Sequence, residues 1–489
     1  MAEVTFSVTN RKGKVLVHKG YEYIEAWKRA DVKTEQCQTW RCRDKTRCKA
    51  RLFYVNGKAT ERDHHSHAPD VVKVNANSAR QVLKARAATT LERPRQIIDE
   101  VRADIPLTVA VQMTSYDALA QTIVRQRKAA GVPGTRVNTL ADIDGSYFLK
   151  ENARGESILI ADTGREDEHR IIVFGDPKCF DNLAKSAVWL SDGPFSVSPP
   201  IFTQLYTVHG NVYGSTAPLV YGLLPNKCEL TYRRFFEIIR DQLVGKGGQG
   251  TFGPEYMIMD FEQSSIIAFR TVFPNSKLRG CNFHFGQNVY RKLVNLGLGP
   301  AYATDPEFSL SCRMLFALAF VPVKDVQRVL AELLKIPEFP FKQGDPFIDY
   351  LRTTYIGHTA FVIPSNRCIV TKPLFPVEFW SCWDRLEDDV HRTTNRLEAW
   401  HRTFSDAVNK DHPGIYALHD LLAREIVHQQ TEVALRMAGA APKQKKKYVE
   451  VTKRLKNVAS SYGQMDSADY LRSVASNLEI LLGKRDEPL

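Results

Sequence analysis

The segment from Ser186 to His284 decides the fold. It opens with three apolar runs in succession, SAVWLSD (186–192), FTQLYTVHG (202–210) and PLVYGLLP (218–225). It continues with the amphipathic run TYRRFFEIIRDQLV (231–244), the apolar YMIMDF (256–261), the helix-like SIIAFRTVF (265–273) and the strand-like KLRGCNFH (277–284). This order predicts three strands and then a helix, a strand, a helix and a strand, which together make a mixed sheet with helices packed on it.

The flanks of this segment are less regular. Two runs before it, SILIAD (157–162) and RIIVFG (170–175), are typical of strands, whereas residues 286–395 indicate mostly helix and loop. A strong helical pattern returns from Asn395 to Gln430, and the linker AGAAPKQKKK (438–447) leads into one or two amphipathic helices. The lysines of this linker, Lys443 and Lys445–Lys447, are either a nuclear localisation signal, a phosphate contact or an ordinary solvated linker.

The N-terminal 130 residues have two different patterns. Residues 1–70 alternate apolar and polar in short runs, which predicts a small antiparallel sheet with tight hairpins. From Asn77 to about Gly131 the spacing is helical, with breaks at Pro94 and Pro106. Basic side chains among its apolar positions favour either a DNA-end-binding or dimerisation module or plain helical packing: Arg80, Lys84, Arg86, Arg93 and Arg95.

Composition narrows the class of protein. The 489 residues include 67 Lys and Arg against 55 Asp and Glu, a net charge of +12, and the first hundred residues alone hold 21 basic against 12 acidic residues, a net +9. An anionic partner bound by the N-terminal part, or simply a solvated basic surface, accounts for this asymmetry. No run approaches the ~20 apolar residues that span a bilayer, so we expect no membrane-spanning protein. The N-terminus has no apolar signal-peptide core, and nine cysteines spread thinly along the chain favour reduced thiols in the cytosol or nucleus.

A cysteine and histidine cluster lies near the N-terminus. Cys42 and Cys48 are followed by His65 and His67, and two thiolates with two imidazoles are a complete tetrahedral ligand set for one zinc ion. A sheet of this size buries little apolar surface, so a structural metal would stabilise it. The spacing alone leaves open two core thiols beside a surface histidine run, and His64 competes with His65 as the ligand.

Several anchors of this region resemble a FLYWCH-type zinc finger: Phe6, Gly13, Leu16, Gly20-Tyr21, Trp40-Arg41-Cys42, Cys48-Lys49-Ala50-Arg51 and His65-Ser66-His67-Ala68-Pro69-Asp70. The resemblance implies a small β-sheet that holds one zinc with Cys42, Cys48, His65 and His67 and that recognises DNA or protein. Between and beside the ligands, four basic residues are candidates for phosphate contacts or ordinary solvated charges: Lys45, Arg47, Lys49 and Arg51.

Two aspartates end apolar runs of the central segment. Asp192 closes AVWLSD and Asp260 closes YMIMD, and a carboxylate at the end of a buried strand is costly unless it is compensated. A turn at Asp192-Gly193 and a helix cap at Asp260 would compensate them without any function. The alternative is that both bind Mg²⁺ or Mn²⁺, since two such ions ~3.5–4 Å apart suit phosphoryl transfer.

A second series of anchors resembles the catalytic domain of Mutator-like element (MULE) transposases. It comprises Asp192-Gly193-Pro194-Phe195, Gln204 to Gly210, Pro218 to Tyr221, Leu224 to Lys227, Asp260-Phe261-Glu262, Ala268 to Arg270, Phe273-Pro274, Arg279 to His284, Thr394-Asn395, Glu398 and Trp400-His401. The resemblance covers most of residues 150–430. It implies an α/β, RNase H-like mixed-sheet domain with a DDE triad in which Asp192, Asp260 and Glu398 hold two Mg²⁺ or Mn²⁺ ions, interrupted by a mostly helical insertion.

The same resemblance bears on neighbouring residues. Cys281 and His284 match the family's C-x-x-H element. The pair is a candidate metal or DNA contact, and structural packing is the alternative for Cys281. His401 shares a helix face with Glu398 and is a candidate phosphate contact or an orienting residue. Pro194 stands where the family usually has Thr, and Pro fixes φ and removes an N–H beside the catalytic strand.

The sequence therefore predicts a DNA transposase in the nucleus, with double-stranded DNA (terminal repeats and target) as its partner and a homodimer expected from the two ends that transposition joins. The alternative is a domesticated DNA-binding regulator without catalysis; a host nuclease of the same fold is a third reading. The expected organisation is a finger (1–72), a helical segment (73–150), a catalytic domain in two parts (151–294 and 391–435) around an insertion (295–390), and a basic linker with C-terminal helices (436–489).

Overall fold

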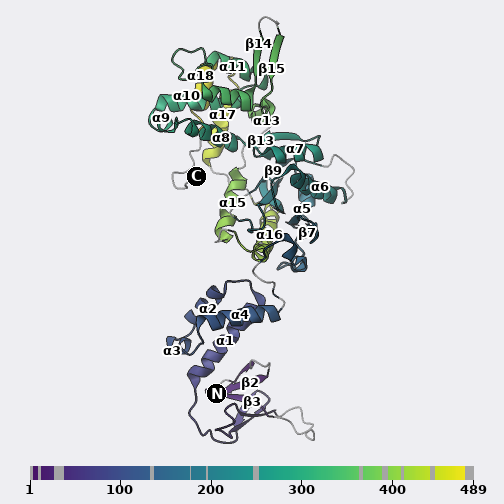
Figure 1. The fold of residues 1–489 in the computed structure, drawn as a ribbon, viewed down its shortest axis with the longest axis vertical. Helices are drawn as coiled ribbons and strands as arrows, with labels where there is room; N and C mark the ends of the chain where they lie inside the picture. The colour runs from purple at the N-terminus through teal and green to yellow at the C-terminus, as the bar shows by residue number, and fades with distance from the viewer. Residues whose placement is uncertain are drawn as a thin grey trace. The chain divides into compact units, whose positions relative to one another are not determined.

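The computed structural model describes residues 4–8, 13–26, 38–130, 132, 137–176, 178–193, 197–245, 253–362, 367–387, 395–408, 412–440 and 446–478. The chain divides into two compact units, Met1–Arg136 and Val137–Leu489. Figure 1 labels the helices and strands of both units. Each unit is described by itself below.

The first unit begins with a six-stranded antiparallel sheet in which every strand pairs with its sequence neighbours. Its strands are β1 (Thr5–Val8), β2 (Lys14–His18), β3 (Tyr21–Glu25), β4 (Gln38–Cys42), β5 (Arg51–Val55) and β6 (Lys58–Glu61). One face carries a cluster of fully buried side chains, Leu16, Tyr23, Trp40 and Leu52. These strands confirm the alternation predicted for residues 1–70, because each of the short runs became a strand.

Four helices complete the first unit: α1 (Val71–Thr89), α2 (Pro94–Ala103), α3 (Leu107–Ala110) and α4 (Tyr116–Ala129). Pro94 is the first residue of α2 and Pro106 caps α3, as expected for a residue that fits the first turn of a helix but not its interior. The helices share a core that includes Leu83, Ile98 and Ile123. Helix α1 also contacts β1 and β3, and Asn77 Nδ2 of α1 donates a hydrogen bond to Glu22 Oε1 of β3 at 2.9 Å.

A seven-stranded sheet in the order β13-β12-β9-β10-β11-β8-β7 is the centre of the second unit. Its strands are β7 (Leu159–Asp162), β8 (Ile172–Gly175), β9 (Val188–Asp192), β10 (Gln204–Val212), β11 (Ser215–Leu224), β12 (Tyr256–Met259) and β13 (Lys277–Gly280). β9, β12 and β13 pair in parallel, whereas β10 is antiparallel to both β9 and β11. The predicted mixed sheet is therefore confirmed.

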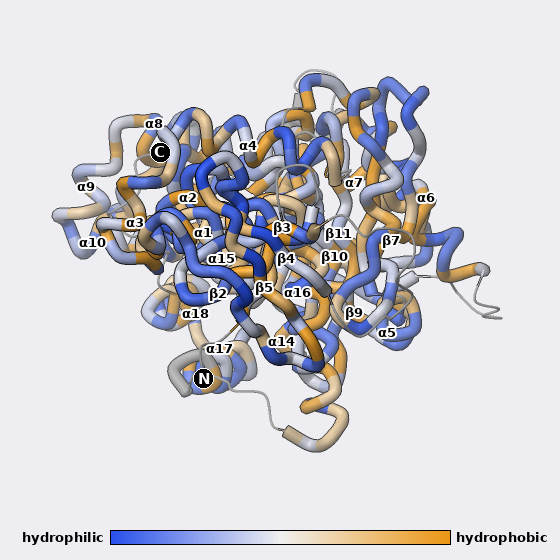
Figure 2. Tube along the Cα trace, turned by 90° about the horizontal axis from the view of Figure 1, so that it is seen from below, coloured by the Kyte–Doolittle hydropathy of each residue, from blue (hydrophilic) through white to orange (hydrophobic). Residues whose placement is uncertain are grey.

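Helices pack on both faces of this sheet. On one face α5 (Cys179–Lys185), α6 (Glu229–Gly245) and α7 (Gln263–Val272) bury side chains against Trp189, Val208 and Met257. On the other, α15 (Asn395–Val408) packs on β9 and β11, and α16 (Ile415–Met437) packs on β11. Hydrophobic and hydrophilic residues both occur along α6 and α7, as expected for helices with one buried side (Figure 2).

A mostly helical region lies between α8 (Asn282–Asn295) and α15. It contains α9 (Gly299–Thr304), α10 (Pro306–Ala317), α11 (Val326–Leu333), α12 (Pro346–Leu351), α13 (Val377–Trp380), α14 (Trp383–Glu387) and a hairpin of β14 (His358–Val362) and β15 (Arg367–Thr371). The C-terminal helices α17 (Lys446–Ala459) and α18 (Ser467–Ala475) pack on this region, α18 against α10 and α11 and α17 against α14.

Two sequence predictions need correction in detail. The run 277–284 is a strand only as far as Gly280, because Cys281 caps α8 and the following residues are helical. The hairpin β14–β15 was not predicted, since its short runs lie between helical segments. Among the described helices, none combines the length and the apolar composition needed to cross a membrane.

Candidate metal centres

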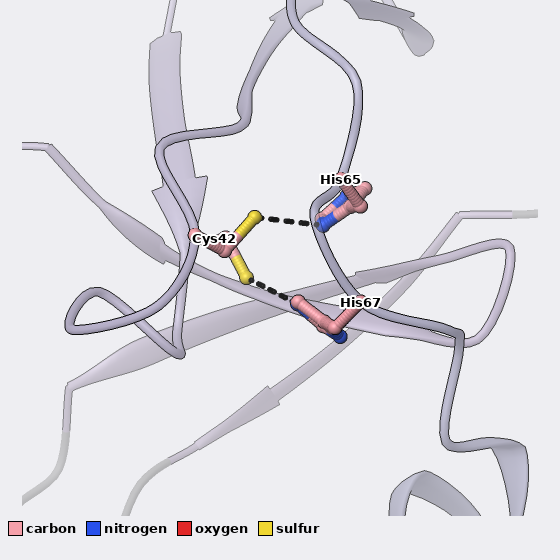
Figure 3. Close-up of side chains that lie close together, drawn as sticks. Cys42, His65 and His67 are labelled. Carbon is pink, nitrogen blue, oxygen red and sulfur yellow. Dashed lines mark hydrogen bonds between the residues drawn. The ribbon is translucent and has the colours of Figure 1, made fainter.

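Four side chains of the first unit converge in the geometry of a metal site. The ligand atoms of Cys42, Cys48, His65 and His67 all lie within 4.8 Å of one another. Cys42 Sγ is 3.3 Å from His67 Nε2, and Cys48 Sγ is 3.3 Å from His65 Nδ1. A tetrahedral zinc with ordinary bond lengths separates sulfur and nitrogen by about 3.5 Å. The cluster is therefore a possible metal site that is consistent with zinc, and Figure 3 shows Cys42, His65 and His67 pointing toward one another.

Aromatic and backbone groups fix both histidine rings. His65 Nε2 lies 2.7 Å from the Tyr23 hydroxyl, and the ring of Tyr21 stacks on the His65 ring with centroids 3.5 Å apart. His67 Nδ1 lies 2.9 Å from the carbonyl oxygen of Ala68. Each ring thus bonds a neighbour with the nitrogen that faces away from the cluster, which leaves His65 Nδ1 and His67 Nε2 for a metal.

The two thiols have different environments. Burial raises the pKa of Cys42 to about 11. Burial also acts to raise the pKa of Cys48, but hydrogen bonds from the backbone N–H groups of Ala50 and Ser66 outweigh it and bring that pKa below its usual value. A bound cation would favour the thiolate of both, because the ligating form of cysteine is the deprotonated one.

The basic residues predicted around the finger are exposed. Lys45, Arg47 and Lys49 lie in the loop between β4 and β5, and Arg51 is the first residue of β5. Three arginines of the helical segment are instead engaged within the unit, whereas Arg93 is exposed. Arg86 pairs with Glu92 and Glu100, Arg95 lies 3.4 Å from Asp99, and Arg80 donates to the carbonyl oxygen of Gln112 at 2.8 Å.

The second candidate centre lies at the edge of the large sheet where β9 and β12 end. These strands are parallel, and Ile258 is level with Leu190 in their register. Asp192 is the last residue of β9 and Asp260 comes directly after the last residue of β12, so both carboxylates lie at the same edge of the sheet. Both carboxylates accept a hydrogen bond from the next backbone N–H, Asp192 Oδ1 at 2.8 Å and Asp260 Oδ1 at 2.6 Å.

A small pocket with a volume of about 40 Å³ opens between the two aspartates. Its other lining residues are Ser191, Gly193, Gln204, Tyr206, Lys227, Glu262 and Ser265. Lys227 Nζ lies 2.9 Å from Glu262 Oε2, and the Tyr232 hydroxyl donates to Glu262 Oε1 at 2.8 Å. The pocket is therefore polar, and its carboxylates outnumber its cationic side chains.

Each aspartate has a histidine beside it. His284 Nδ1 lies 3.5 Å from Asp260 Oδ1, and His401 Nδ1 lies 3.5 Å from Asp192 Oδ2. Burial lowers the pKa of His284, but Cys281 and the charges of Asp260 and Asp192 outweigh it and raise that pKa to about 10. Burial, reinforced by His284, lowers the pKa of His401 to about 3, so His401 is neutral at pH 7.

The groups around Asp192 act on its pKa in both directions. Burial raises the pKa of Asp192, even though a fifth of its side-chain surface is still exposed, and Asp260 raises it further. Lys227 and His284 act in the opposite direction on Asp192. Two neighbouring carboxylates that favour protonation of a nearby imidazole also favour a bound divalent cation, which prefers oxygen ligands.

Glu398 belongs to α15, the helix that covers this end of the sheet. Its side chain lies outside the described residues, as does Pro194. The neighbouring Leu397 is fully buried in a cluster with Leu190, Ile258 and Cys281. Because side chains two residues apart on a strand share a face, Leu190 and Ile258 mark the face toward which Asp192 and Asp260 also point. The backbone at Glu398 therefore lies beside Leu397, which contacts both β9 and β12.

The matches to known families agree with this geometry. Residues 188–288 match the MULE transposase domain. The matched range contains Asp192, Asp260, Cys281 and His284 and ends before Glu398. No curated protein matches the chain. The match spans 101 of the 489 residues, so this segment is similar to a transposase domain.

Sequence reasoning missed several residues of the pocket. Gln204, Lys227 and Glu262 were recognised only as parts of longer motifs, without a role at the site. Gln204 Nε2 donates to the hydroxyl of Tyr232 at 2.5 Å, and Tyr232 in turn donates to Glu262, so the three side chains form one chain of hydrogen bonds. Each of the three residues stands next to an apolar run of the sequence. That context does not show that their side chains meet at one pocket, which depends on the folding of the sheet.

Cys281 is a packing residue in the part of the chain that the structure describes. It is fully buried among Leu190, Ile258 and Leu397, and its backbone N–H donates to the carbonyl oxygen of Met259 at 2.8 Å. It also influences the pKa of His284.

Proposed function

We propose that this protein is a DNA transposase of the DDE type, with an RNase H-like catalytic domain and an N-terminal FLYWCH-type zinc finger. The observation that carries the proposal is the common position of Asp192 and Asp260 on neighbouring parallel strands, on the face that α15 covers. The strand order β13-β12-β9-β10-β11, in which β10 alone runs antiparallel to the other four, supports an RNase H-like sheet.

Asp192, Asp260 and Glu398 would hold two Mg²⁺ or Mn²⁺ ions. The donor set fits such ions, because all three ligands are carboxylates and the described part of the pocket already favours positive charge. Bound there, the ions would activate water for hydrolysis of a phosphodiester and stabilise the leaving oxygen.

Other residues of the chain orient the two aspartates and face the DNA backbone. The N–H groups of Gly193 and Phe261 orient the two aspartates, and His401 and His284 support them from the protein side. Lys227, held by Glu262 at the pocket wall, adds a cationic group toward an anionic DNA backbone. The 3′-hydroxyl released at a transposon end would then attack target DNA at the same site.

The finger would hold one zinc ion with Cys42, Cys48, His65 and His67, whose distances suit a tetrahedral ion. Because DNA is its proposed substrate, we also propose that the protein acts in the nucleus. Joining two transposon ends calls for a homodimer. A domesticated DNA-binding regulator is the alternative, and terminal inverted repeats around the reading frame would favour the transposase over it.

The test is cleavage of linear DNA that carries the genomic sequences flanking the reading frame, incubated with the full chain in Mg²⁺ or Mn²⁺. We expect cuts at the element's ends that disappear in Asp192→Ala and in Glu398→Ala. Asp406→Ala is the matched control, since Asp406 is an exposed carboxylate on the same helix as Glu398. Equal products from the wild type and both active-site variants, or products from none of the proteins, would overturn the proposal.

A further inference from the structure

The finger sheet has a second face, opposite to its buried aromatic cluster. Trp40 of β4 and Leu52 of β5 are cross-strand partners on the core side. Their sequence neighbours Arg41 and Arg51 are also direct partners, so both arginines point to the opposite face. Both are exposed.

A third arginine extends this row across the next strand. Arg62 follows β6, and its backbone N–H donates to the carbonyl oxygen of Arg51 at 2.9 Å, which continues the ladder between the strands. Its guanidinium carbon lies 5.6 Å from the centre of the Phe53 ring. Phe53 is two residues after Arg51 and lies on the same face, so a cation–π contact holds the Arg62 head group there. We call Arg41, Arg51 and Arg62 the arginine row.

Within the described residues, none of the three guanidinium groups forms an ion pair. Two acidic side chains of the same sheet are engaged elsewhere, because Glu22 accepts from Arg43 at 2.6 Å and Glu61 lies 3.3 Å from Lys19 and 3.6 Å from His18. This differs from the helical segment of the same unit, where Arg86 pairs with two glutamates.

Like charges that face each other directly across two strands destabilise a sheet. Arg41 and Arg51 are such a pair, and an external anion is what would compensate them. Helix α1 contacts β1 and β3, whereas the side chains of Arg41, Arg51 and Arg62 are all exposed. Neighbouring strands are ~4.8 Å apart, so the row presents closely spaced cations to a polyanion.

From this arrangement we propose that the arginine row is the surface through which the finger binds the phosphate backbone of duplex DNA. Duplex DNA carries one charge per ~1.7 Å of its axis, so each guanidinium group of the row has a phosphate within reach, and its major groove admits a two-stranded β-ribbon. This inference rests on the proposed function for the identity of the nucleic acid, and it places the contact on the sheet face rather than in the loop of Lys45, Arg47 and Lys49.

The test compares two triple variants of the full chain that lose the same charge. One carries Arg41→Gln, Arg51→Gln and Arg62→Gln, and the other carries Lys45→Gln, Arg47→Gln and Lys49→Gln. Affinity for a fluorescent mixed-sequence DNA duplex is measured across a salt series. Loss of about three phosphate contacts should reduce the slope of log K against log salt by ~2.7 and weaken binding about 100-fold near 150 mM salt. The loop variant should lose much less.

Two further measurements keep the test decisive. Arg41→Lys, Arg51→Lys and Arg62→Lys together keep the charge and should keep the salt slope. If the glutamine variant loses its zinc, the wild type is modified with phenylglyoxal instead, and the duplex should protect all three arginines from the reagent. Equal losses in the two glutamine variants, or arginines that the duplex leaves reactive, would overturn the inference.

The partner is tested separately. An RNA duplex of the same sequence should bind more weakly, and tighter arginine-dependent binding to the RNA would overturn the assignment to DNA. Cleavage by the wild type provides the independent readout of the proposed function. If DNA binding depends on the arginines but no cleavage occurs, the inference about the arginine row stands and the transposase proposal fails. If cleavage occurs but binding does not depend on the arginines, the transposase proposal stands and the inference about the arginine row fails.

Discussion

His401 Nδ1 lies 3.5 Å from Oδ2 of Asp192, and this contact joins α15 to the end of β9. On its other side His401 Nε2 lies 3.4 Å from the Thr207 hydroxyl of β10. The imidazole therefore touches both strands from the helix that carries Glu398. Because burial keeps His401 neutral, it orients Asp192 without competing with a cation for the carboxylate charge.

Replacing His401 should weaken metal binding more than it weakens folding. In His401→Ala the Asp192 carboxylate loses a neighbour that orients it, and losses of this kind cost roughly 10–100-fold in metal affinity or activity. We expect the Mg²⁺ or Mn²⁺ concentration for half-maximal cleavage to rise by that factor. His428→Ala on α16 is the control, since His428 is exposed. An unchanged metal dependence with reduced thermal stability would show that His401 only packs.

Tyr23 should tune the zinc affinity of the finger. Tyr23→Phe removes the hydroxyl that lies 2.7 Å from His65 Nε2 but keeps the ring in the core of the sheet. We expect zinc to bind about 10–100-fold more weakly in competition with a chromophoric chelator. Tyr54→Phe removes a hydroxyl from a half-buried tyrosine of the same sheet and should leave the affinity unchanged. Equal affinities of Tyr23→Phe and the wild type would contradict this role.

The ion pair between Asp167 and Arg234 should make the second unit sensitive to acid. Hydrogen bonds from Arg234 on α6 lower the pKa of Asp167 to about 2. Since the folded pKa is below the unfolded value of ~3.9, the pair stabilises the fold above pH 4, and this contribution disappears as the pH falls from 4 to 2. After a discount for partial exposure it amounts to ~1–2 kcal/mol.

Urea unfolding of the wild type and Asp167→Asn measures this effect. We expect the free energy of unfolding to differ by ~1–2 kcal/mol at pH 6 and to converge near pH 2. Asp241→Asn is the control, because Asp241 is exposed on the same helix and pairs only with the adjacent Arg240 among the described residues. If the free energies of unfolding of the wild type and Asp167→Asn still differ at pH 2, the substitution destabilises the protein through packing and not through charge.

Gly222 allows α6 to approach the sheet closely. A Cβ atom at this position in β11 would lie 2.4 Å from the ring of Phe235. Gly222→Ala should therefore destabilise the second unit by ~1–3 kcal/mol, the usual cost of overpacking a core. Gly245→Ala at the end of α6 meets open space and should have little effect. Equal stability of both variants in thermal unfolding would show that Phe235 moves aside freely.

Most of the central sheet could be predicted from the sequence, because apolar runs such as LYTVHG and LVYGLLP have strand length and lie between turn residues. The positions of Asp192 and Asp260 at strand ends followed from two further apolar runs, AVWLSD and YMIMD. Their common register did not, since parallel pairing of β9 with β12 depends on contacts between distant segments.

Other features could not be predicted because they are products of tertiary contact. The pairing of Glu262 with Lys227 joins two motifs 35 residues apart. The burial of Leu397 against Leu190 and Ile258 brings α15 to the site across the whole helical insertion. The cysteine and histidine cluster, in contrast, was a candidate from its residue types, and the resemblance to a FLYWCH-type finger selected His65 over His64 as a ligand.

The central claim is that Asp192, Asp260 and Glu398 form one site for two divalent ions. Electron paramagnetic resonance of Mn²⁺ titrated into the zinc-loaded full chain tests it without any DNA substrate. We expect two tightly bound ions in the wild type and in the exposed-carboxylate control Asp406→Asn, and loss or at least ~10-fold weakening of one ion in Glu398→Gln. If Glu398→Gln binds Mn²⁺ with the number and affinity of the wild type, Glu398 is not a ligand and the proposed triad is wrong.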